Sequence, residues 1–191
     1  VRIYTDRHFD QHGGTFVGGF DTLDINNSFQ LYGGTFVAPP GVMRINRHFW
    51  HYTGADFRHN NGTIVFIGGN SNFRFDSQTD TVHNLILALD NNRRLNCNNQ
   101  DTVLIEGDLI VNDGFINNGY LKMLNGAPQL SASFDGGSGD IEISGADTLT
   151  ISSTEMCGLV LSHPSALVST SGGNCIFEGD INLQNGTIDY S

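Results

Sequence analysis

The side chains best suited to bind a ligand are three consecutive residues, Trp50, His51 and Tyr52. An aromatic ring can stack on the apolar face of a sugar while a neighbouring polar group hydrogen-bonds to its hydroxyls. The cluster therefore predicts a glycan-binding surface. The alternative interpretation is that these side chains pack in the core or at a corner of the fold.

A second candidate site is acidic and lies in the stretch FDGGSGDIEIS at residues 134–144. Carboxylate oxygens suit Ca²⁺, so Asp135, Asp140 and Glu142 are the candidate metal ligands, and calcium is the one cofactor that the sequence suggests. The calcium-binding nonapeptide GGxGxDxUx is only partly matched, because Asp140 directly follows Gly139 and no second copy comes nine residues later. A flexible acidic corner without an ion is the alternative.

The elements that must position these residues are strands. The chain of 191 residues contains 24 Gly and 13 Phe but only 15% charged residues, a composition that favours turns and strands over helices. The pentapeptide GGTFV begins at residue 13 and again at residue 33. This repetition indicates that the chain is built from units of about twenty residues.

Pairs of apolar residues, alternating as they would on the inner face of a strand, recur at about this period. The predicted ladder consists of Val1/Ile3, Leu23/Ile25, Met43/Ile45, Ile64/Phe66, Leu85/Leu87, Val103/Ile105, Leu121/Met123, Ile141/Ile143, Leu159/Leu161 and Cys175/Phe177. Two further columns have the same period: Phe9, Phe29 and Phe49, and Phe16, Phe36 and Phe57.

Stacked units of this length predict an all-β fold, a parallel β-solenoid of about nine or ten turns of roughly 16 to 22 residues each. We expect it to be right-handed, because the hexapeptide rhythm of left-handed solenoids is missing. An antiparallel sandwich would not explain why columns recur once in about twenty residues.

The predicted register has consequences for two other residue types. Cys157 and Cys175 are expected in neighbouring turns but two positions out of step, too far apart for a disulfide, so we expect both to be reduced and to face inward. His12, Tyr32 and Tyr52 should form a stacked outer column.

Charge and hydropathy limit the partners. Residues 1–94 contain eight Arg and eight Asp, whereas residues 95–191 contain twelve acidic residues against Lys122, within a net charge of −11. The acidic half argues against a nucleic-acid partner. No apolar run approaches the roughly 18 residues of a membrane span, so we expect no membrane insertion.

The phrases INRHFWHYTGADFRHNNGTIVFIGG, VHNLILAL and LIEGDLIVNDGFINNGYLKMLNG resemble the right-handed β-helix repeats of bacterial surface proteins, including filamentous-haemagglutinin and autotransporter adhesins. The resemblance implies an extracellular or cell-surface protein that serves as a stalk, fibre or adhesive surface. It carries over no catalytic residues, because the group has no shared active-site motif.

We expect residues 1–191 to form a single solenoid domain without a cap at either end. Solenoids that end in water carry polar capping segments, and neither end of this chain reads as one. The expected function is that of a structural or adhesive module that self-associates into a filament or belongs to a longer chain, with a cell-surface glycan as a further partner.

Other functions are the alternatives. β-Helices include polysaccharide lyases and glycoside hydrolases, which use grouped carboxylates with a nearby base. The chain contains no Asp-Asp pair, Gly-His-Gly or Arg-x-Lys. We therefore expect no enzyme, and a glycan-binding or glycan-cleaving β-helix, of the lyase or phage-tailspike kind, remains the alternative. A flat threonine row for ice binding is not sustained, because Thr15 and Thr35 are followed by Ala55.

Overall fold

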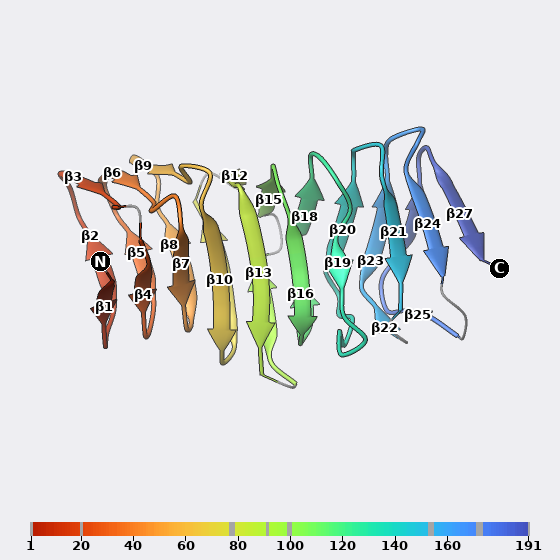
Figure 1. Cartoon of the computed structure of the whole chain (residues 1–191), viewed down its shortest axis with the longest axis horizontal. Coiled ribbons are helices and arrows are strands. Elements are labelled where there is room, and N and C mark those ends of the chain that lie inside the picture. Colours follow the sequence, from red (N-terminus) through yellow and green to blue (C-terminus); the bar gives the residue numbers. More distant parts are fainter. Residues whose placement is uncertain are drawn as a thin grey trace.

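The computed structural model describes residues 2–19, 21–76, 79–90, 92–98, 101–152, 155–170 and 174–190, with Tyr190 as backbone alone. In these ranges the chain forms short strands joined by turns, without a helix, and therefore without one that could span a membrane. Each strand pairs in parallel with its counterparts in neighbouring turns, which confirms the predicted parallel β-solenoid (Figure 1).

The first face of the solenoid lies toward the viewer in Figure 1. Its strands are β1 (Ile3–Thr5), β4 (Leu23–Ile25), β7 (Val42–Ile45), β10 (Thr63–Gly68), β13 (Asn84–Leu89), β16 (Leu109–Asp113) and β19 (Gln129–Leu130), then β21 (Thr148–Ile151), β24 (Leu167–Thr170) and β27 (Thr187–Tyr190). They form a seven-stranded and a three-stranded sheet, which meet where β19 contacts β21. The solenoid has about eight turns, slightly fewer than the nine or ten predicted.

The second face follows the first along the chain. It contains a six-stranded sheet and, further on, a two-stranded one. The strands are β2 (Phe9–Gln11), β5 (Phe29–Leu31), β8 (His48–His51), β11 (Ser71–Phe75), β14 (Arg94–Cys97) and β17 (Phe115–Asn117), then β22 (Glu155–Met156) and β25 (Ile176–Phe177). Two isolated bridges, Gly114 with Phe134 and Asp135 with Glu155, connect the two sheets.

The third face returns the chain to the first. Its strands are β3 (Thr15–Val17), β6 (Gly34–Val37) and β9 (Ala55–Arg58), then β12 (Thr79–Val82), β15 (Thr102–Ile105), β18 (Tyr120–Met123), β20 (Asp140–Ile143), β23 (Gly158–Leu161) and β26 (Ile181–Leu183). In Figure 1 the near strands descend and the far strands ascend while the chain advances from left to right, which is the predicted right-handed winding.

Alternate side chains of the strands between the two terminal turns fill the interior. The two predicted phenylalanine columns are confirmed, because Phe29 pairs with Phe9 and Phe49, and Phe36 pairs with Phe16 and Phe57. Phe29 and Phe49 have ring centroids 5.0 Å apart, and both side chains are fully buried. Contacts of this kind between aromatic rings stabilise the core beyond the burial of their area.

The predicted ladder of apolar pairs is correct in two stretches and wrong where they were joined. Pairs from Leu23 to Leu85 stack on the first face, and pairs from Val103 to Leu159 stack on the third. Leu85 pairs with Leu109, 24 residues further on (85 to 109), and not with Val103. Because this turn is longer than the average repeat, the predicted ladder passed from the first face to the third at this point.

The two ends of the ladder also need correction. The first pair is Ile3 with Thr5, two residues later than predicted, because Ile3 pairs with Leu23. At the other end Leu159 pairs with Ile181, not with Cys175. The predicted partner of Leu161, Phe177, lies on the second face and pairs with Met156.

Candidate functional site

The three residues of the predicted glycan site do not share a surface. In β8 the side chain of Phe49 points inward, so alternation along the strand turns Trp50 outward and His51 inward. Trp50 pairs with Gln30 and Arg74 on the neighbouring strands, and Tyr52 continues the outer surface beyond the strand. The structure therefore brings Trp50 and Tyr52 together on the outside of the second face and separates them from His51.

His51 is engaged in the interior. Its Nδ1 lies 2.5 Å from a carboxylate oxygen of Asp80, and its Nε2 lies 3.0 Å from the carbonyl oxygen of Ala55. The side chains of His51 and Asp80 are 12% and 13% exposed. Burial lowers the pKa of His51, but the hydrogen bond and charge of Asp80, with the Ala55 carbonyl and Asp56, raise that pKa overall. An acceptor beside each ring nitrogen favours the protonated ring, which is why the pKa of His51 is raised.

The predicted outer column is present and is continuous. The His12 and Tyr32 rings have centroids 4.6 Å apart at an interplanar angle of 3°, and those of Tyr32 and Tyr52 are 4.5 Å apart at 12°. The guanidinium carbon of Arg74 lies 5.4 Å from the centroid of the Tyr52 ring. Tyr32 and Tyr52 therefore each have both ring faces covered by neighbours within the column.

This stacking determines what the outer surface can do. A sugar binds an aromatic side chain across its ring face, and the faces of Tyr52 are occupied by Tyr32 and Arg74. Trp50 lies nearly parallel to His48, at 6° and a centroid distance of 5.3 Å. The Tyr52 ring therefore has a structural role in the stacked column. Trp50 is the main residue that could bind a glycan, and glycan binding stays a prediction.

The acidic candidates for calcium lie on two faces. Asp135 belongs to the second face, and its Oδ2 is buried without a hydrogen-bond partner. Asp140 and Glu142 project from β20 on the third face. Burial, followed by the charge of Asp180, raises the pKa of Asp140. The calcium assignment also stays a prediction.

Glu142 is already satisfied by protein groups. Its carboxylate accepts hydrogen bonds from the hydroxyl of Ser162 and from Lys122 Nζ, the latter at 3.1 Å. Burial raises the pKa of Glu142, but the hydrogen bonds from Ser162, Lys122 and Tyr120 lower it overall. A calcium ion would have to compete with these three donors.

The cysteines are free thiols in the described residues. Cys97 and Cys157 are buried, and burial raises the pKa of each thiol to about 12, which makes both poor nucleophiles at neutral pH. Cys175 is half-buried. Cys157 and Cys175 are not bonded to each other, as the sequence predicted.

A cluster that the sequence reasoning missed lies at the corner after the third face. His59, His83 and Glu106 have potential ligand atoms all within 4.8 Å of one another. The sequence signal that could have revealed this cluster is that each of the three residues directly follows a third-face strand. The steps between them, 24 and 23 residues (59 to 83, 83 to 106), are longer than the average repeat, so a search at the average period does not align them. The predicted ladder also paired Leu85 of the first face with Val103 of the third, so it did not place these three residues at one corner.

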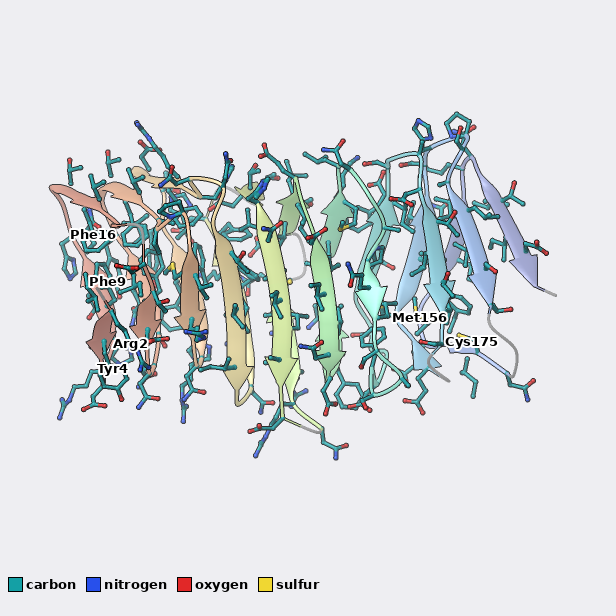
Figure 2. All side chains as sticks on the ribbon, in the orientation of Figure 1. Arg2, Tyr4, Phe9, Phe16, Met156 and Cys175 are labelled. Atoms are coloured by element: carbon teal, nitrogen blue, oxygen red, sulfur yellow. The ribbon has the colours of Figure 1, made fainter. Side chains whose placement is uncertain are left out.

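The two ends of the solenoid are open and apolar. At the C-terminal end a hollow of about 590 Å³ is lined by side chains that include Ile151, Val168, Phe177 and Ile188. Figure 2 shows Met156 and Cys175 near this end, and Phe9 and Phe16 near the other. Comparison of the chain with protein-family models, curated proteins and solved structures finds no match.

Proposed function

We propose that the chain is a structural module of an extracellular filament or adhesin, in which copies of the solenoid stack end to end. The observation that carries this proposal is the exposure of apolar inward positions in the terminal turns. Ile181 and Leu183 are 49% and 53% exposed, whereas Leu159 and Leu161, which they pair with, are fully buried. At the other end Ile3 is 46% exposed and its partner Leu23 is 2% exposed.

Strand edges support the same proposal. The outer side of a terminal turn presents unpaired N–H and C=O groups that pair readily with another strand. The final turn carries Glu178, Asp180 and Asp189 without a basic residue, whereas in the first turn Arg2 and Arg7 are balanced by Asp6 and Asp10. Two acidic final turns would repel each other, so this distribution favours head-to-tail contact over contact between two C-terminal ends. The location outside the cell rests on the sequence resemblance alone.

The proposal is tested by sedimentation velocity over a range of protein concentrations. We expect the chain to associate, and Ile181→Lys to shift it toward monomer, because a charge would then lie at the edge of the stack. Thr150→Lys, on an exposed position of β21 away from both ends, is the matched control and should associate as the unmodified chain does. A monomer at every concentration, or association unaffected by Ile181→Lys, would contradict end-to-end stacking.

Glycan binding is the second candidate function, favoured by the outward position of Trp50 beside His48 on β8. We propose binding and no reaction at this surface; His51, whose two ring nitrogens already lie against acceptors, is directed into the interior. Binding to a glycan array should be lost in Trp50→Ala. Binding that is unchanged by this substitution would count against the candidate.

A further inference from the structure

Three consecutive turns place a nitrogen or oxygen ligand at the same corner of the solenoid. His59 directly follows β9, His83 directly follows β12, and Glu106 directly follows β15. Val82 pairs with Ile105, which puts His83 and Glu106 side by side. We propose that His59, His83 and Glu106 bind a divalent first-row transition metal ion such as Zn²⁺.

The distances fit such an ion after a small contraction. Nε2 of His59 lies 3.5 Å from Oε2 of Glu106, and Nδ1 of His83 lies 3.7 Å from the same oxygen. Zinc binds imidazole nitrogen and carboxylate oxygen at about 2.0 to 2.2 Å with near-tetrahedral angles, so its ligand atoms lie roughly 3.3 to 3.5 Å apart. All three ligand atoms here lie within 4.8 Å of one another.

An unsatisfied buried atom is the second observation. Nδ1 of His83 is shielded from solvent and has no hydrogen-bond partner, although it is directed toward Glu106. A buried nitrogen without a partner is unfavourable, and a bound metal ion would supply that partner. The rings of His59 and His83 are parallel within 12°, at a centroid distance of 5.8 Å, so both can approach an ion beside them.

Binding requires one local rearrangement at His59. Its Nδ1 accepts a hydrogen bond from the backbone N–H of Asn61 at 3.1 Å, which in the neutral ring leaves the proton on Nε2. Coordination through Nε2 moves that proton to Nδ1 and breaks this hydrogen bond. Asn61 is exposed, so water can accept from its N–H in place of the ring.

The ligand set determines the class of metal. Two imidazoles and one carboxylate suit Zn²⁺ and other first-row transition ions, whereas Ca²⁺ and Mg²⁺ prefer sites made of oxygen. The side chains of His59, His83 and Glu106 are 21%, 31% and 42% exposed, so water can complete the coordination. In the part of the chain that the structure describes, no other group of three His, Cys, Asp or Glu residues comes this close.

The test uses the whole chain, freed of metal with a chelator and titrated with ZnCl₂ by isothermal titration calorimetry. We expect one ion per chain and a higher Tm with zinc, because binding to the folded state alone stabilises it. His83→Gln and Glu106→Gln should each weaken binding at least tenfold. Co²⁺ in place of Zn²⁺ should give visible d–d absorption that both variants lose, a readout that does not depend on stability.

His163→Gln is the matched control, because His163 lies in the C-terminal half of the chain and its Nδ1 accepts only a local backbone hydrogen bond from Ser165. It should bind zinc as the unmodified chain does. Circular dichroism establishes that each variant is folded. Absence of binding, or binding that survives both His83→Gln and Glu106→Gln in folded protein, would overturn the proposal.

Discussion

At the scale of single residues, the direction of a side chain decides its role. Trp50, His51 and Tyr52 are adjacent in sequence, yet strand alternation places His51 against Asp80 in the interior and the other two outside. Sequence could identify the aromatic residues and the strand. It could not identify the partner of His51, because Asp80 lies 29 residues away in a different strand.

The ion pair of His51 predicts a dependence of stability on pH. The pKa of His51 is raised above 6.5 in the folded chain, so the folded state holds this proton more tightly than the unfolded state. The resulting stabilisation is complete below the unfolded pKa of about 6.5 and is lost as pH rises through the folded pKa. The free energy of unfolding from urea titrations should therefore fall from pH 6 to pH 8.

His51→Gln should flatten this fall, because glutamine does not titrate. The pKa of His48 is lowered, first by burial and then by Arg47 and His8, which gives an opposite dependence that both proteins share. The comparison between them therefore isolates His51. An equally steep fall in the variant would show that another group is responsible.

At the scale of strands and corners, the aromatic columns were predictable and the long turn was not. Phe9, Phe29 and Phe49 repeat with a constant step, and the structure stacks them. The step from Leu85 to Leu109 could not be read from the sequence, because the pair Val103 and Ile105 lies between them and has the same apolar pattern. All three faces share one local pattern, so periodicity alone does not distinguish them.

The corner glycines give a prediction at this scale. Gly34 has a φ of +81°, and a Cβ built on it would lie 2.2 Å from the carbonyl oxygen of Gly14 in the preceding turn. Gly34→Ala should lower the free energy of unfolding by about 1 to 3 kcal/mol, since both the conformation and the close approach require glycine. Urea titration measures this loss.

Gly13→Ala is the control for Gly34→Ala, because a Cβ on Gly13 has no atom within 4 Å and its φ lies outside the left-handed region. Its free energy of unfolding should change by less than about 0.5 kcal/mol. Equal losses in the two variants would mean that the turns do not stack at this corner as described.

At the scale of the whole molecule, the interior is closed along its length and open at the ends. Phe66 and Leu87, near the middle, are fully buried, whereas Ile176 and Ile181 near one end are 61% and 49% exposed. Strand patterns in the sequence continue to both ends and predict a solenoid without caps, which stays a prediction. The sequence does not identify a partner for these edges, because the same edge suits another copy or further solenoid in the same chain.

Electron microscopy of the purified chain tests the central claim most directly, since it reports the turns and their stacking together. We predict unbranched rods that lengthen with protein concentration, with layers spaced by about 4.8 Å along the rod axis. Separate compact particles of constant size at every concentration would contradict the proposal that the solenoid stacks end to end.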